Sequence, residues 1–108
     1  TLQDILRDLP ADTPLNIKAL HRNAPLAMAC AVQIIDRVRQ NPSIQTALKH
    51  EYRYTHRAVA QGDFIEGIRA AIIDKDRSPR WQHSSPYDVT SAEVDTMTSP
   101  LQEQELTL

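Results

Sequence analysis

The sequence predicts an all-α fold, a small bundle of four main helices with one or two short ones. Apolar residues recur at intervals of three and four in several segments, which is the period of one helix face. Signatures of the form Thr-x-x-Asp/Glu, typical of helix N-termini, begin at Thr1 and Thr90. Prolines separate these segments, and no segment alternates apolar and polar residues as a strand does.

The first two predicted helices are short. The first begins at Thr1 and stops at Pro10, with apolar residues Ile5, Leu6 and Leu9. Thr13-Pro14 then supplies a cap residue and a first-turn proline for the second helix. We expect this helix to end near Asn23, with its buried side formed by Leu15, Ala19 and Leu20.

The helix expected over residues 25–40 is apolar on nearly every side. It starts at Ala24-Pro25 and carries Leu26, Met28, Cys30, Val32, Ile34 and Ile35. A helix that is apolar all round is buried all round. Neighbouring helices in so short a chain cover only part of it, so we expect one side to be an interface. The single cysteine, Cys30, is interpreted as a small buried core residue.

The next helix, over residues 43–61, is predicted to start at Asn41-Pro42 and to end at Gly62 as a C-cap. Its predicted buried stripe is Ile44, Leu48, Tyr52, Thr55 and Val59. Its predicted solvated face is Gln45, Lys49, Arg53 and Arg57. We interpret Tyr52 as pointing inward; an alternative adds a structural ion pair between Glu51 and a cation such as Arg69.

A further helix is expected to start at Asp63 with Glu66 three residues on, and to bury Ile65, Ile68 and Ile72. Gly67 inside it costs about 1 kcal/mol relative to alanine, which we expect a close approach to another helix to offset. After Asp76 the period ends, and the residues from Ser78 to Trp81 predict an extended loop with an aromatic anchor.

The charge of the chain changes after residue 80, and its helical period ends near residue 98. Its net charge is −2, but residues 1–80 hold all 12 basic residues and residues 81–108 hold five acidic residues and no basic one. Thr90 opens a short helix to about Met97, and residues 99–108 show no apolar period. We therefore expect a helical domain over 1–98 and a flexible acidic tail over 99–108.

Composition and motifs exclude several classes of function. The balance of charge gives no reason to expect nucleic acid, and no apolar run approaches the ~20 residues of a membrane span. The chain starts at Thr1 without a signal peptide, so we expect a soluble protein that is a piece of something longer. The four histidines lack metal-site spacing, and no phosphate-binding glycine loop or nucleophile elbow is present. We expect no metal site and no catalytic residue, and predict that the chain alone is inactive.

The most specific segment runs from Asp63 to Trp81. It contains Asp-Phe-Ile-Glu-Gly-Ile-Arg-Ala, then Ile-Asp-Lys-Asp, then Ser-Pro-Arg-Trp. This resembles the C-terminal signature of the crotonase (enoyl-CoA hydratase/isomerase) superfamily, and most of all its 3-hydroxyisobutyryl-CoA hydrolase branch. The resemblance covers nearly the whole chain in order, with further matches at Asn23–Leu26, Leu48–Arg53, Val89–Asp95 and Pro100-Leu101.

The resemblance implies that this chain is the helical C-terminal region of such an enzyme. In the family an N-terminal core carries the oxyanion hole for the thioester carbonyl and the acidic catalytic residues, and the helical region covers the acyl-CoA site and makes subunit contacts. The implied partners are that core, the coenzyme A ester and a second copy. Lys75 matches a lysine near the CoA phosphates; its alternative is a solvated lysine past a helix end. Ala71 and Thr98 stand where the family would have aromatic residues.

The implied activity of the parent protein is hydrolysis of a short branched hydroxyacyl-CoA, as in valine breakdown. Coenzyme A would enter as part of the substrate, and no covalently bound cofactor is expected. The expected location is the cytoplasm, or the mitochondrial matrix in a eukaryote. An enoyl-CoA hydratase or isomerase is one alternative, and a non-catalytic helical interaction module is another.

Overall fold

The computed structural model describes residues 1–13 and 17–107, and it is helical with no β-strand among those residues. The elements are α1 (Leu2–Arg7), α2 (Ile17–Arg22), α3 (Pro25–Gln40), α4 (Ile44–Gln61), α5 (Phe64–Ile68), the π-helix η1 (Arg69–Ile73), the 3₁₀ helices η2 (Pro86–Asp88) and η3 (Gln102–Gln104), and α6 (Ser91–Thr98). The all-α prediction is confirmed. Within the described residues, no helix is both long and apolar enough to cross a membrane.

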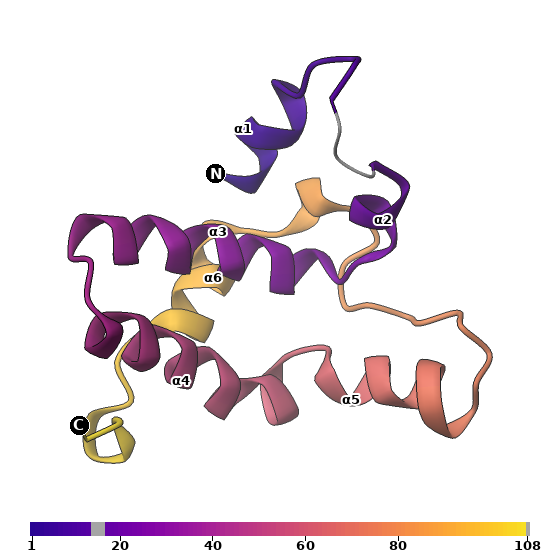
Figure 1. Ribbon diagram of the computed structural model, residues 1–108. Coiled ribbons are helices and arrows are strands. Elements are labelled where there is room, and N and C mark those ends of the chain that lie inside the picture. The colour runs from indigo at the N-terminus through magenta and orange to yellow at the C-terminus, as the bar shows by residue number, and fades with distance from the viewer. Residues whose placement is uncertain (14–16, 108) are drawn as a thin grey trace.

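The centre of the fold is a helical hairpin. α3 and α4 run in opposite directions, and α6 packs against both of them (Figure 1). α1 lies against α3, whereas α5 and η1 continue beyond the end of α4, away from this centre. The long segment after η1 then returns toward α3 and α6. The radius of gyration is 14.9 Å, against about 13 Å for a compact domain of about 100 residues, so the arrangement is open.

The hydrophobic core lies where α1, α3 and α6 meet. It consists of Leu2, Leu26, Ala29, Cys30, Val89 and Met97. Cys30 is 1% exposed, which confirms it as a core residue, and burial raises the pKa of its thiol to about 11. The thiol therefore stays protonated at neutral pH and has little nucleophilic character.

Local hydrogen bonds explain where α1, α4 and α6 start. The side chain of Thr1 accepts from the backbone N–H of Asp4, and that of Thr90 from the backbone N–H of Glu93, so the capping boxes predicted at these two threonines are complete. α3 starts at Pro25 and ends at Gln40, as predicted. α4 differs slightly, because Ser43 rather than Asn41-Pro42 caps it by accepting from the backbone N–H of Thr46. For the second helix, Pro14 and Leu15 lie outside the described residues.

Gly62 ends α4 as predicted, but for another reason than a left-handed backbone. Its φ is −106°, a value open to any residue. A Cβ built on Gly62 would instead lie 2.9 Å from the carbonyl oxygen of Ala58, closer than side chains come to backbone. The position requires glycine because there is no room for a Cβ atom.

The residues after α6 contact α4. Arg53 Nε donates to Glu105 Oε1 at 2.8 Å, and Glu105 Oε2 accepts from the Leu101 backbone N–H at 2.8 Å. Although residues 81–108 hold no Lys or Arg, their acids find partners elsewhere in the chain: Glu93 pairs with His83 and Asp95 with Arg37. The division into a domain over 1–98 and a flexible tail over 99–108 stays a prediction.

Candidate docking and ligand-binding surface

α4 presents its apolar stripe to solvent. Ile44 is 66% exposed and Val59 57%, and Leu48, Tyr52 and Thr55 are exposed as well. The prediction that this stripe is buried is wrong for this chain. Tyr54, not Tyr52, is the tyrosine that packs against the core.

The side of α4 that packs carries Tyr54 and the buried Ala58. It extends to Arg53 and Arg57, which were predicted to be solvated, whereas Gln45 is exposed as predicted. Arg57 Nη1 donates to the carbonyl oxygens of Met97 and Ser99, at 3.1 and 2.7 Å. Arg53 forms the ion pair with Glu105 described above. The reason is that α6 and the residues after it offer carbonyl and carboxylate oxygens, which guanidinium groups bind while their carbon stems cover apolar surface.

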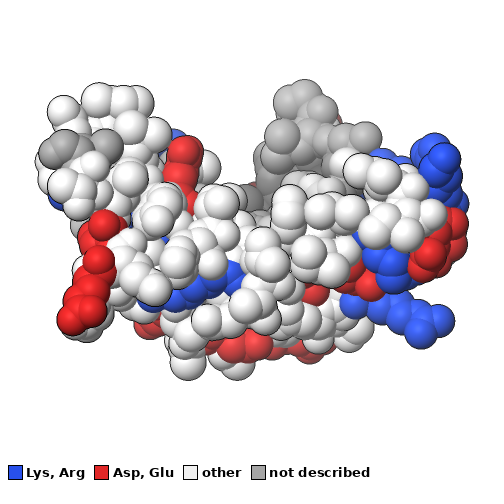
Figure 2. Space-filling model, turned by 90° about the horizontal axis from the view of Figure 1, so that it is seen from below, with Lys and Arg blue, Asp and Glu red and all other residues white. Residues whose placement is uncertain are grey.

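α5 and η1 carry a second exposed apolar group. Phe64, Ile65, Ile72 and Ile73 are all more than half exposed, so the predicted burial of Ile65 and Ile72 is also wrong for this chain. We call the two groups together the exposed apolar set, formed by Ile44, Leu48, Tyr52, Val59, Phe64, Ile65, Ile72 and Ile73. Seen from below, the molecule is largely uncharged across its middle, and Lys and Arg gather at one end beside acidic residues (Figure 2).

An apolar cavity of about 330 Å³ opens between α3, α4 and α5. Its lining includes Ala27, Tyr54, Ala58, Phe64, Ile72 and Trp81. A Cβ on Gly67 would lie 3.5 Å from Trp81 Cη2, so the neighbour that Gly67 approaches is a loop tryptophan and not the expected helix. Trp81 is anchored as predicted, because its indole N–H donates to the carbonyl oxygen of Arg22 at 2.9 Å.

Asp63 precedes α5 but does not cap it with its side chain, so the predicted capping box is wrong. Asp63 Oδ1 accepts from the backbone N–H of Gln82 at 2.9 Å, which ties the start of α5 to the loop after Trp81. The side chain is 6% exposed, and Oδ2 is buried without a hydrogen-bond partner among the described residues.

Arg69 is the most connected side chain of this region. Its guanidinium donates to both carboxylate oxygens of Glu66, at 2.8 and 2.7 Å. It also donates to Asp74 at 2.9 Å and to Asp76 at 2.7 Å. These bonds hold the pKa of Glu66 down to about 2, lower that of Asp76 and raise that of Arg69. The alternative pair between Glu51 and Arg69 is wrong.

Lys75 lies in the turn directly after η1, and its side chain is exposed. Its backbone is left-handed, with φ of 55°, which is uncommon for a residue other than glycine. The expected contact of Lys75 with CoA and the expected lack of catalytic residues both stay predictions. The role of Arg69 was missed from the sequence, although its spacing of three residues from Glu66 is a known signal for a helical ion pair.

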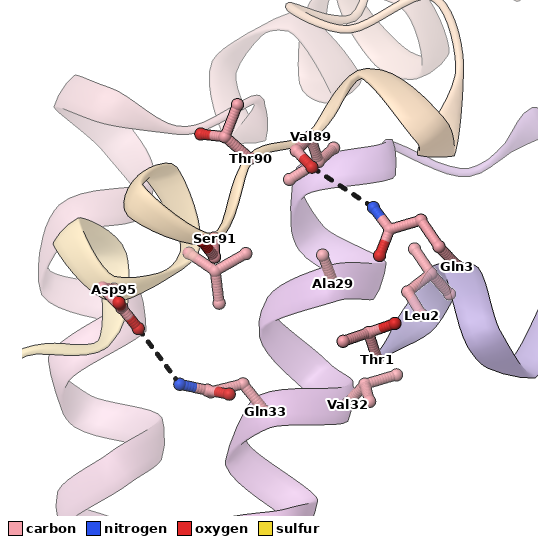
Figure 3. A pocket seen from close by; sticks show the side chains of 11 residues that line it. Thr1, Leu2, Gln3, Ala29, Val32, Gln33, Val89, Thr90, Ser91 and Asp95 are labelled. Atoms are coloured by element: carbon pink, nitrogen blue, oxygen red, sulfur yellow. Dashed lines mark hydrogen bonds between the residues drawn. The ribbon is translucent and has the colours of Figure 1, made fainter.

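A smaller pocket of about 110 Å³ lies between α1, α3 and α6. Figure 3 shows Thr1, Leu2 and Ala29 around it, with Gln33 Nε2 donating to Asp95 Oδ1 and Gln3 Nε2 donating to the Val89 carbonyl oxygen (Figure 3). These two bonds are 3.2 Å long and fasten the rim of the pocket. The pocket is too small for a coenzyme and has no pair of facing acids.

The histidines do not assemble into a site. His83 is 8% exposed, and its Nε2 lies 2.6 Å from Glu93 Oε2. The pKa of Glu93 is lowered, first by the backbone N–H of Thr90 and then by His83. Among residues 1–13 and 17–107, no three His, Cys, Asp or Glu side chains gather where they could hold a metal ion. The expectation of no metal site stays a prediction.

A family profile described as "Enoyl-CoA hydratase/isomerase" matches residues 2–98. The mitochondrial 3-hydroxyisobutyryl-CoA hydrolase of Gallus gallus is 30% identical over 112 residues, covering 100% of this chain and 29% of that protein. The small ribosomal subunit protein mS47 of Arabidopsis thaliana is 34% identical over 90 residues, covering 81% of this chain and 22% of that protein.

A solved structure supports the same relationship. The crystal structure of an enoyl-CoA hydratase from Rhodobacter sphaeroides 2.4.1 is 49% identical and superposes with a TM-score of 0.89. The match covers 100% of this chain and 33% of that chain. The chain therefore spans a third or less of the length of these relatives.

Proposed function

We propose, from the fact that this chain belongs to the enoyl-CoA hydratase/isomerase family, that it is the helical C-terminal part of a CoA-thioester hydrolase. In this proposal it covers the acyl-CoA site of an N-terminal core and contacts that core or a second subunit. The catalytic groups belong to the core. The substrate is a short hydroxyacyl-CoA of the 3-hydroxyisobutyryl type, in the cytoplasm or, in a eukaryote, the mitochondrial matrix.

The exposed apolar set is the observation that carries the docking part of the proposal. Soluble proteins rarely leave contiguous apolar patches beyond a few hundred Å² uncovered. α4, α5 and η1 present eight large apolar side chains that are between 36% and 69% exposed. Because the chain spans only 33% of the solved relative, most of such a protein is available to cover them.

α3 contributes a second, smaller candidate contact. Ile35 is 53% exposed, whereas Met28 and Val32 are partly buried against the core. If α3 is an interface helix, as predicted, the interface therefore lies on the second half of the helix. It is tested by the concentration dependence of sedimentation, in which Ile35→Asp should reduce any self-association of the 108-residue chain.

The substrate part of the proposal rests on the hydrolase relatives and on the exposed Lys75. The solved relative is named an enoyl-CoA hydratase, so hydration of an enoyl-CoA is the alternative reaction. The two reactions are separated in the full-length parent protein by their products. A hydrolase releases free CoA thiol from 3-hydroxyisobutyryl-CoA, whereas a hydratase consumes the double bond of an enoyl-CoA and releases no thiol.

A non-catalytic module is the alternative from another class, favoured by the ribosomal relative mS47. The test is whether the full-length parent has either activity. Absence of both, in a protein that is folded, would contradict the enzymatic proposal and support the module.

Docking is tested by supplying the 108-residue chain in trans to the remainder of the parent. Leu48→Asp and Ile72→Asp should each prevent association, since both side chains are exposed in the chain but buried in the proposed contact. Ala92→Asp, at an exposed position in the first turn of α6, is the matched control and should associate normally. Normal association of both test variants would refute the proposed surface.

A further inference from the structure

The apolar cavity between α3, α4 and α5 is walled in part by aromatic rings. Its lining includes Trp81 and Phe64, the only tryptophan and phenylalanine of the sequence, and Tyr54, one of three tyrosines. Small and aliphatic side chains form most of the remaining wall. Its volume of about 330 Å³ falls within the range of small-molecule sites, about 300–1,000 Å³.

The Trp81 ring is held from two directions. Its indole N–H donates to the carbonyl oxygen of Arg22 at 2.9 Å, and the ring lies against Gly67, where an added Cβ would be 3.5 Å from Cη2. Phe64, by contrast, is 55% exposed, so its ring can turn. A ring that is already fixed loses little freedom when a ligand binds to it.

Of the described residues that line the cavity, Asp63 alone carries a charge. Asp63 is 6% exposed; Oδ1 accepts from the Gln82 N–H at 2.9 Å, whereas Oδ2 has no hydrogen-bond partner within the described part of the chain. Its negative charge reaches the neighbouring wall, since the pKa of Tyr54 is raised first by burial and then by Cys30 and Asp63. A buried charge without a counter-ion costs free energy, which a cation bound beside it offsets.

Aromatic rings and a carboxylate select the same kind of ligand. The face of an aromatic ring attracts a cation, most strongly in tryptophan, and apolar walls accept the alkyl groups of an alkylated ammonium. An anionic ligand such as a CoA ester is repelled by Asp63, and a neutral ligand leaves the buried charge unbalanced. A quaternary ammonium has no N–H to donate, so the buried Oδ2 attracts it through the wall without a direct hydrogen bond.

We propose that this cavity binds a small organic cation, an alkylated ammonium group, between Trp81, Tyr54 and Phe64 and beside Asp63. Two sources share this chemistry: a free alkylammonium compound, and the lysine or arginine side chain of a docked part of the parent protein. The inference does not depend on the proposed function, because its ligand is opposite in charge to a CoA ester and no reaction is involved.

The first experiment uses the fluorescence of Trp81, which reports on the cavity because it is the only tryptophan and lines it. Choline is titrated into the 108-residue chain and should change the fluorescence saturably. The neutral tert-butyl analogue of choline, in which a carbon atom replaces the nitrogen, should bind at least about tenfold more weakly. Absence of saturable choline binding, or equal affinity for the two probes, would overturn the proposal.

Two variants test the charge and the cavity separately. Asp63→Asn keeps an oxygen for the Gln82 N–H but removes the charge, so choline should bind about tenfold more weakly and the tert-butyl analogue as before. Ala27→Leu fills the cavity and should abolish binding of both probes, which also serves if Asp63→Asn does not fold. Asp12→Asn, the same change at an exposed acid outside the lining, is the matched control. Unchanged choline affinity in either test variant would refute the assigned site.

The full-length parent identifies the source of the cation. Equal choline affinity in the parent and in the 108-residue chain would assign the site to a free ammonium compound. Binding to the chain only, together with weaker association of the Asp63→Asn chain with the remainder of the parent, would assign it to a lysine or arginine of that remainder. Binding to the chain only, with normal association of Asp63→Asn, would mean that apolar packing covers the cavity in the parent, and would overturn the proposal.

Discussion

Substitution by alanine should change the free energy of unfolding in opposite directions at the two glycines, Gly62 at the end of α4 and Gly67 within α5. At Gly67 an added Cβ would meet Trp81 at 3.5 Å, an ordinary contact, and nothing nearer. Alanine there gains helix propensity, so we expect Gly67→Ala to stabilise the chain by about 0.5–1 kcal/mol. At Gly62 the Cβ would lie 2.9 Å from a backbone oxygen, which has no rotamer to change. Gly62→Ala should therefore destabilise by about 1–3 kcal/mol, the usual cost of overpacking.

The assay is urea unfolding of the 108-residue chain, followed by circular dichroism and compared at equal m-values. Ala31→Gly, at an exposed position in the middle of α3, gives the propensity difference in this protein and should cost about 1 kcal/mol. Destabilisation by Gly67→Ala equal to that by Gly62→Ala would refute the reasoning, because it would mean that Gly67 is required by close packing after all.

Four further outcomes are expected. Met97→Ala should destabilise the chain by about 2–5 kcal/mol in the same unfolding assay, because Met97 is 2% exposed in the core and its loss leaves a cavity. The pKa of Glu66 is lowered to about 2, so its stabilising contribution should be complete above the unfolded pKa near 4.5 and be lost as the pH falls toward 2. Proteolysis by an acid protease should show the turn after η1 opening over that pH range. Opening already at pH 6 would contradict this. The 108-residue chain alone should not hydrolyse 3-hydroxyisobutyryl-CoA, and turnover in the ordinary range of about 1–1000 per second would contradict the assignment of catalysis to a core. Arg53→Gln should raise amide exchange in residues 101–105, since it removes the ion pair with Glu105, and unchanged exchange would show that the tail is already open.

The sequence alone determined the features that depend on a few neighbouring residues. The capping boxes at Thr1 and Thr90, the limits of α3 and the Trp81 anchor were all predictable. A cap requires only a hydroxyl and a backbone N–H three residues away, and a first-turn proline acts on its own residue. The family was predictable for a similar reason, since its signature from Asp63 to Trp81 is continuous in the chain.

The tertiary structure decided which side of each helix is covered. α4 has an apolar side and an arginine side, and the usual rule buries the apolar one. In this chain the arginine side is covered, because α6 and the tail bring the Met97 and Ser99 carbonyls and Glu105 within reach of Arg57 and Arg53. Periodicity shows that a helix has two sides, but the side that is buried depends on the partner that is present. The same holds for Arg69, whose carboxylate partners Asp74 and Asp76 come within reach only through the π-turn and the left-handed residues that follow it.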